Sequence, residues 1–130
     1  LLVGQAEIVE TDHDLIPYLI SAPTMRVPMI LEETVNPYLA ARAVFRLLAT
    51  GVFKNGVQQG ERVSDVIQTL AFPGLGTGVG RVSFENCARQ VKAAYVDFKE
   101  GFSSFPNSWH DAQRKHQKLY TEDIRDLQKY

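Results

Sequence analysis

The sequence has a single cysteine, Cys87, and no run of about eighteen apolar residues. One cysteine cannot close a disulfide within the chain, and no cysteines and histidines are grouped with the spacing of a metal site. Without a long apolar run there is no candidate transmembrane helix, and the first residues, Leu-Leu-Val-Gly, lack the basic flank of a signal peptide. These absences predict a cytoplasmic protein, and nothing in the sequence calls for a metal ion or another cofactor.

An excess of charge is missing as well. The chain carries 14 Lys and Arg residues against 15 Asp and Glu residues, a formal net charge of −1, and these residues form no basic block. Proteins that bind nucleic acid or anionic membranes depend on clustered positive charge, so direct binding to either partner is not indicated. Oligomeric state leaves no signature in this sequence.

Length and composition fit one globular domain over residues 1–130. We divide it into an α/β core at residues 1–101 and a helical tail at residues 102–130. Apolar periodicity predicts strands at residues 7–11, 15–22 and 66–72, and helices at residues 36–49 and 83–100. The chain has no initiating methionine and opens close to a strand, which favours a fragment of a longer protein that lacks its N-terminal part.

The predicted helices have recognisable ends and apolar sides. Thr34 or Asn36 is the expected cap of the first helix, and Ser83 that of the second. The second helix has an apolar stripe of Phe84, Cys87, Ala88, Val91, Ala94, Tyr95 and Phe98, so Cys87 is interpreted as a core residue. In the tail, Asn107 or Ser108 is expected to cap a helix that packs through Trp109, Ala112, His116 and Leu119. A further short helix is predicted from Thr121.

Residues 66–80 read Val-Ile-Gln-Thr-Leu-Ala-Phe-Pro-Gly-Leu-Gly-Thr-Gly-Val-Gly. Their first half is apolar and β-branched enough for a buried strand, and their second half is rich in glycine just before a predicted helix. A helix start carries unpaired N–H groups and the positive end of the helix dipole, and glycine lets an anion reach them without meeting a Cβ. This arrangement predicts a phosphate site at Gly74, Gly76, Gly78 and Gly80, beside the Thr77 hydroxyl.

Two common phosphate loops do not fit this stretch. A Walker loop requires Gly-Lys-Ser/Thr, and no lysine stands between Leu70 and Lys92. The dinucleotide fingerprint requires glycine at its first, third and sixth positions, and the sixth position counted from Gly74 is Val79. Asp97, the acid nearest to the required spacing, lies within a predicted helix. Neither an ATP site of the Walker type nor a dinucleotide site is indicated.

The stretch resembles the phosphate-binding loop of macro domains, an α/β family that binds ADP-ribose. Macro domains carry a strand that ends in Phe-Pro, a turn of small residues, Ser/Thr-Gly-Val, a glycine and then a helix. Residues 72–80, Phe-Pro-Gly-Leu-Gly-Thr-Gly-Val-Gly, match that order, and residues 4–11 and 15–23 are similar to two earlier strands of the family. Residues 22–28, together with the loop, resemble a phage- and bacteria-associated macro-like subgroup.

The resemblance implies a three-layer α/β/α sandwich around a mixed sheet, with the site at the carboxyl ends of the strands. It implies that the partner is ADP-ribose or an ADP-ribosylated molecule. The diphosphate would be held by backbone N–H groups of the loop, with Thr77 as the side-chain donor. The ligand-binding residues would be Gly74, Leu75, Gly76, Thr77, Gly78, Val79 and Gly80.

Two features of the family are absent from the sequence. An aromatic residue usually stands between the positions of Val79 and Gly80, and the Asn- and Gly-rich loop of the hydrolytic members would precede Gly4. One alternative is therefore a hydrolase that removes ADP-ribose from a modified target, with its catalytic loop on an N-terminal segment and its catalytic residues unknown. A second alternative is a glycine loop that only joins strand and helix. Arg26 is open between a phosphate ligand and a structural ion pair.

Overall fold

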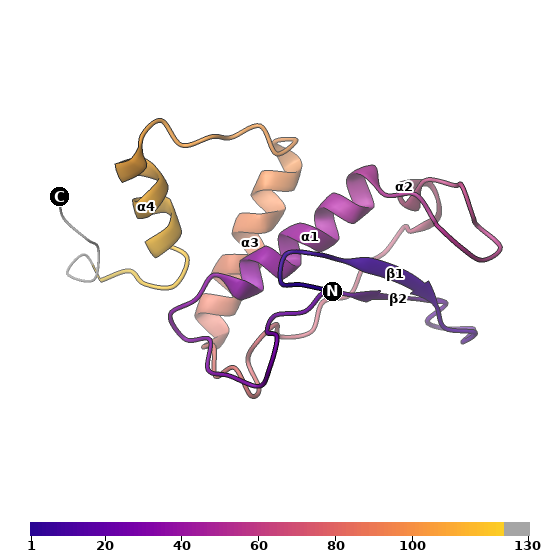
Figure 1. Cartoon of the computed structure of the whole chain (residues 1–130), viewed down its shortest axis with the longest axis horizontal. Coiled ribbons are helices and arrows are strands. Elements are labelled where there is room, and N and C mark those ends of the chain that lie inside the picture. The colour runs from indigo at the N-terminus through magenta and orange to yellow at the C-terminus, as the bar shows by residue number, and fades with distance from the viewer. Residues whose placement is uncertain (124–130) are drawn as a thin grey trace.

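The computed structural model describes residues 1–123, which form a mixed α/β structure (Figure 1). Its elements, in chain order, are β1 (Glu7–Glu10), β2 (Tyr18–Ser21), α1 (Asn36–Thr50), α2 (Val63–Val66), α3 (Phe84–Lys99) and α4 (Trp109–Gln117). None of these helices is long and apolar enough to cross a membrane. At this level the predicted α/β class is confirmed.

The sheet of the described residues is the antiparallel pair of β1 and β2. Ile8 and Ile20 are register partners, are half-buried and line one hollow together with Val44 of α1. Val9 and Leu19, the next pair of partners, are 48% and 57% exposed. Because successive side chains of a strand point to opposite faces, one face of the pair is turned to the core and the other is open.

The prediction of a buried strand at residues 66–72 is wrong: no strand forms there in the described part of the chain. Val66 closes α2, and residues 67–74 then run on without a turn or a bend. Leu70 and Phe72 are half-buried against the core, whereas the intervening Ala71 is exposed. This alternation is that of a strand. Gln68 and Thr69 are both exposed, so this alternation is confined to residues 70–72, and the 67–72 segment has neither the paired backbone nor the full side-chain pattern of a strand.

α1 and α3 pack against each other and form the main core. The ring of Phe45 on α1 stacks on that of Phe98 on α3 with a centroid distance of 5.4 Å, and it also contacts Phe72 at 5.4 Å. Ala41 and Ala94 are fully buried in the same cluster, because small side chains let two helices approach closely. The 67–72 segment is thus held to the two helices by its aromatic end.

The bounds of α1 agree with the prediction because local signals mark both ends. Pro37 lies in the first turn, where its missing N–H is not needed, and Gly51 follows the last residue. The predicted cap is wrong, however. Val35 occupies the cap position and its side chain makes no capping hydrogen bond, while the Thr34 hydroxyl accepts only a long hydrogen bond, of 3.4 Å, from the N–H of Asn36. The first N–H groups of α1 must therefore find acceptors elsewhere.

α3 begins as predicted, with the Ser83 hydroxyl accepting a hydrogen bond from the N–H of Asn86 at 3.1 Å. Its predicted apolar stripe is only partly right. Cys87 is buried, but Phe84 is 78% exposed, and the polar Gln90 is fully buried. The buried face of α3 is centred nearer to Gln90 than the predicted apolar stripe. The prediction counted apolar residues alone, so it could not include a buried amide side chain.

Gln90 supplies the cap that Val35 lacks. Its Oε1 accepts a hydrogen bond from the N–H of Tyr38 at 3.0 Å, and its Nε2 donates to the carbonyl of Thr34 at 2.9 Å. Tyr38 lies in the first turn of α1, where N–H groups have no acceptor within the helix. One buried side chain of α3 therefore fixes the start of α1.

A second polar link joins the same two helices. The Tyr38 hydroxyl donates to the carboxylate of Asp97 at 2.5 Å, and Nε of Arg42 lies 3.5 Å from the same oxygen. Burial and the hydrogen bond to Asp97 raise the pKa of Tyr38 to about 12. Tyr38 is therefore neutral at physiological pH and remains a donor to Asp97.

The helical tail is confirmed for α4, which Ser108 caps by accepting a hydrogen bond from the N–H of Asp111 at 3.1 Å. Figure 1 shows α4 to one side of α3, beyond a long connection. The expected packing of Trp109 is wrong: this side chain is 79% exposed, and Gln117 is the buried residue of the helix. The further helix expected from Thr121 falls mostly on residues 124–130, outside the described residues.

Candidate functional site

The glycine loop, residues 74–80, connects the 67–72 segment to α3. Its first turn is closed by Thr77, whose hydroxyl donates to the carbonyl of Gly74 at 3.0 Å. The hydroxyl proton that the sequence assigns to a ligand is thus directed into the loop. In this structure Thr77 holds the turn.

The base of the loop is anchored by backbone hydrogen bonds. Arg81 N–H donates to Gly78 O at 3.0 Å, Val82 N–H to Gly76 O at 3.1 Å and Leu31 N–H to Gly80 O at 2.7 Å. Leu31 is fully buried, and with Val82 and Cys87 it forms a small core cluster under the loop. Leu75 packs against this cluster and also against that of α1 and α3. The loop therefore sits on packed side chains on both sides.

Some N–H groups of the loop take no part in these internal hydrogen bonds. Those of Gly78, Val79 and Gly80 donate to no backbone or side-chain acceptor in residues 1–123. They are consecutive, and Gly78 and Val79 lie at the surface. Runs of backbone N–H groups with no internal acceptor are the groups that bind phosphates in glycine-rich loops.

Packing explains three of the four glycines in the loop. A Cβ on Gly74 would lie 2.6 Å from the Thr77 hydroxyl, and a Cβ on Gly80 would lie 2.5 Å from the carbonyl oxygen of Gly76. Gly76 itself has φ +74°, in the left-handed region, and its Cβ would lie 3.1 Å from Val82. The fold requires these three residues to be glycine.

Gly78 is the exception. A Cβ at this position would meet no heavy atom within 4 Å, and the φ of Gly78 lies outside the left-handed region. Neither space nor backbone conformation therefore calls for glycine here. A ligand that approaches the backbone at Gly78 would call for glycine at this position.

Charges of both signs surround the loop. Arg81 follows it directly and is exposed, while Glu85 stands in the first turn of α3. Arg26 is exposed next to Met25, which packs against the core cluster of Leu31 under the loop. Within residues 1–123 the Arg26 guanidinium forms no ion pair, so its role as a structural ion pair is not supported.

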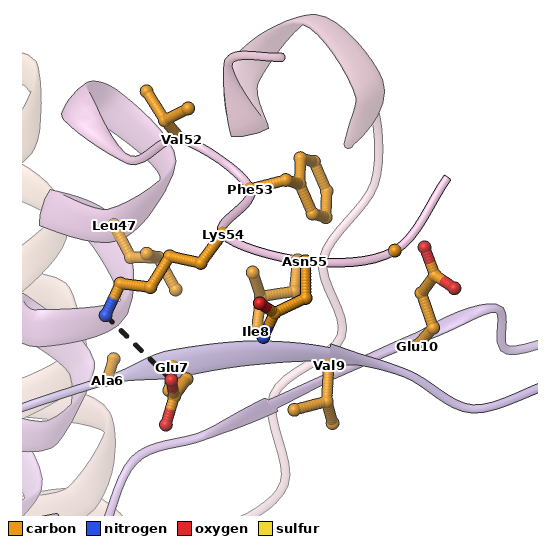
Figure 2. A pocket seen from close by; sticks show the side chains of 11 residues that line it. Ala6, Glu7, Ile8, Val9, Glu10, Leu47, Val52, Phe53, Lys54 and Asn55 are labelled. Atoms are coloured by element: carbon orange, nitrogen blue, oxygen red, sulfur yellow. Dashed lines mark ion pairs between the residues drawn. The ribbon is translucent and has the colours of Figure 1, made fainter. Parts of the chain in front are cut away.

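A small hollow lies beside β1 (Figure 2). Residues 6–10 and 52–56 line it together with Leu47, and its volume is about 190 Å³. The ammonium of Lys54 lies 3.9 Å from the carboxylate of Glu7 across it. Small-molecule sites have volumes of about 300–1,000 Å³, so this hollow is too small for a nucleotide. The hollow lies where residues 52–56, which follow α1, pass over β1.

A larger groove, of about 690 Å³, is lined on one side by β2 and on the other by residues 66–73. Val44 of α1 also lines it, and it reaches the glycine loop at Leu75. Gly76, Thr77, Gly78, Val79 and Gly80 do not line this groove. The candidate ligand-binding residues are thus together in one loop, but the groove beside them is a separate feature.

The described part of the chain has no group of side chains suited to bind a metal ion. No three His, Cys, Asp or Glu residues of residues 1–123 are grouped so that they could hold a metal ion. Cys87 is buried in the cluster under the loop, which confirms its interpretation as a core residue.

Sequence reasoning missed Leu31 as a residue of this site. Its N–H fixes Gly80, and its side chain lies where a Cβ on Gly80 or Gly76 would be. The apolar run Met-Ile-Leu at residues 29–31 was a weak signal, because Met29 and Ile30 are 44% and 53% exposed and only Leu31 of the three is buried.

No protein-family model matches the sequence, and no curated protein or solved structure is significantly similar to it. The resemblance to macro domains consequently rests on the loop motif and on the order of the predicted strands.

Proposed function

We propose that the glycine loop binds the diphosphate of ADP-ribose or of a related nucleotide. The observation that carries this proposal is Gly78, which the fold does not require to be glycine and which begins the run of three unused N–H groups. Its missing side chain leaves the backbone open to a phosphate.

The backbone N–H groups of the loop supply part of the free energy that a metabolite site needs. A hydrogen bond from a backbone N–H to a phosphate oxygen is charge-assisted and contributes about 1.5–3 kcal/mol. Two such bonds, from the exposed Gly78 and Val79, contribute about 3–6 kcal/mol before the cost of association, so contacts to the rest of the nucleotide must add to them to reach micromolar binding. Thr77 contributes by holding the turn, and Leu75 by fixing the loop on the core.

The proposal includes the macro-domain assignment and its three-layer sandwich around a mixed sheet. It also includes a cytoplasmic location, which fits a lone buried cysteine. A hydrolytic activity would need groups that no residue of the loop supplies, so binding is the function that the geometry favours.

Calorimetric titration of ADP-ribose into the chain tests the proposal, with AMP as a competitor. We expect micromolar binding that Gly78→Glu reduces by at least about a hundredfold, because the new side chain brings bulk and negative charge to the phosphate position. AMP, which lacks the diphosphate, should compete weakly. Gly78→Glu should melt within about 2 °C of the native chain, since its Cβ enters open space.

The control is Ser64→Glu, which adds the same charge at an exposed position on α2. This variant should bind ADP-ribose as the native chain does. Absence of binding by the folded chain, or equal binding by Gly78→Glu, would show that the loop is not a diphosphate site.

A further inference from the structure

The groove beside β2 has two walls of unpaired backbone. In the antiparallel pair, Thr11 N–H donates to Pro17 O, so Thr11 and Pro17 are a hydrogen-bonded pair. Hydrogen-bonded and non-hydrogen-bonded pairs alternate along such a ladder. The N–H and C=O groups of Tyr18 and Ile20 consequently point away from β1, toward the groove, and they have no partner among residues 1–123.

The opposite wall has the same property. In residues 67–72, the N–H of Ile67 bonds back to Val63, and no other backbone group of this segment is bonded within the described part of the chain. Leu70 and Phe72 point to the core while Ala71 is exposed, as in a strand at the edge of a sheet. The edge of one strand, β2, and one segment with unbonded backbone groups therefore border the same groove.

The groove also lacks the features that protect free edges. Native proteins place lysine or another charge at an open strand edge. At β1, the connection that carries Lys54 plays this part, because Lys54 and its neighbours cover the strand (Figure 2). All residues that line the groove of β2 are uncharged, and Leu15 and Leu19 on its rim are 86% and 57% exposed. The edge of β2 therefore lacks the charges that would keep another strand from pairing with it.

We propose that the groove is a docking site for one extended, uncharged peptide strand of a partner polypeptide. Such a strand would pair with Tyr18 and Ile20 on one side and with residues 67–72 on the other. Its alternate side chains would enter the groove over Val44 of α1. At about 3.3 Å per residue, the walls match four to six residues. Recognition would be by main-chain hydrogen bonds, with apolar side chains at alternate positions.

This inference goes beyond nucleotide binding and is tested without a nucleotide. The probe is the peptide Lys-Thr-Val-Thr-Val-Thr-Val-Lys, whose valines alternate and whose lysines lie outside the walls. Its control is the same peptide with N-methyl groups on the three valines, which removes alternate donors and leaves the apolar surface. Binding is measured by fluorescence anisotropy, and hydrogen exchange of the protein is followed by NMR.

We expect the unmodified peptide to slow exchange of the amides of Tyr18, Ile20 and residues 67–72 by about tenfold or more, and the methylated peptide to have no such effect. On the protein, Leu19→Lys should weaken binding about fivefold, because it replaces an apolar cross-strand contact at the rim. Val9→Lys is the matched control, since Val9 is the exposed partner of Leu19 but does not line the groove. It should change binding less than twofold.

Three results would each overturn the proposal: no added protection of these amides at saturating peptide, equal binding of the methylated peptide, or equal weakening by Val9→Lys and Leu19→Lys. Protection confined to other amides would likewise show that the peptide binds elsewhere.

Discussion

Gln90 is the residue on which the junction of α1 and α3 most depends. It is fully buried, and both ends of its amide are bonded to the start of α1. Replacing it by a side chain of similar size without polar atoms leaves the N–H of Tyr38 and the carbonyl of Thr34 without partners. Each group left unsatisfied in a partly buried place costs about 1–3 kcal/mol.

We therefore expect Gln90→Leu to lower the free energy of unfolding by about 2–4 kcal/mol, as measured by urea denaturation. Lys92→Leu, on the exposed side of α3, is the control and should change stability by less than about 0.5 kcal/mol. A Gln90→Leu protein as stable as the native chain would mean that water replaces both hydrogen bonds.

The glycine loop combines positions that serve the fold with one that does not. Alanine at Gly80 places a methyl group against the carbonyl of Gly76, and alanine at Gly76 is strained at φ +74°. We expect Gly80→Ala to destabilise the protein by about 3 kcal/mol and Gly76→Ala by about 1–2 kcal/mol. Gly78→Ala should be neutral within about 0.5 kcal/mol, because its Cβ enters open space.

Thermal unfolding of the three variants measures these differences, and titration with ADP-ribose adds the functional half. Gly78→Ala should be the variant that keeps native stability and yet binds more weakly, since its methyl group occupies the approach to the backbone. Three equally destabilised proteins would show instead that Gly78 is a structural glycine like its neighbours.

The helices α1, α3 and α4 could be predicted from sequence because their ends depend on neighbours in the chain, whereas the short α2 was missed and its Val66 was assigned to a strand. Pro37 and Gly51 bound α1, and Ser83 and Ser108 cap α3 and α4, each through contacts within four residues. The glycine loop was recognisable for the same reason. Its turns are closed by residues three to six positions apart.

The sheet and the buried polar contacts could not be predicted in this way. The apolar, β-branched residues near 66–72 favour a strand, but whether a strand forms there depends on a pairing partner distant in sequence. Gln90 and Leu31 are similar cases. Gln90 reads as a surface residue until the start of α1 is placed beside it, and Leu31 matters only once the loop folds over its side chain.

The described part of the chain divides into a body around α1 and α3 and a tail, residues 102–123, that buries little. Gln117 is the buried residue of α4, and Trp109 at its start is exposed. The tail is tied to α3 by hydrogen bonds and charges near its end: Asn86 donates to the carbonyl of Tyr120 at 2.9 Å, and Arg89 lies 2.7 Å from Glu122. An ion pair with a largely exposed carboxylate contributes at most about 1 kcal/mol.

We accordingly expect α4 to open without unfolding of the body. Hydrogen exchange followed by mass spectrometry should show the amides of α4 exchanging at least about a hundredfold faster than those in the centres of α1 and α3, because exchange follows the local free energy of opening. Low concentrations of urea should speed exchange in the body more than in α4, since opening the body exposes more surface. Equal protection of all three helices would instead make the tail part of one cooperative unit, held by more than the contacts to Asn86 and Arg89.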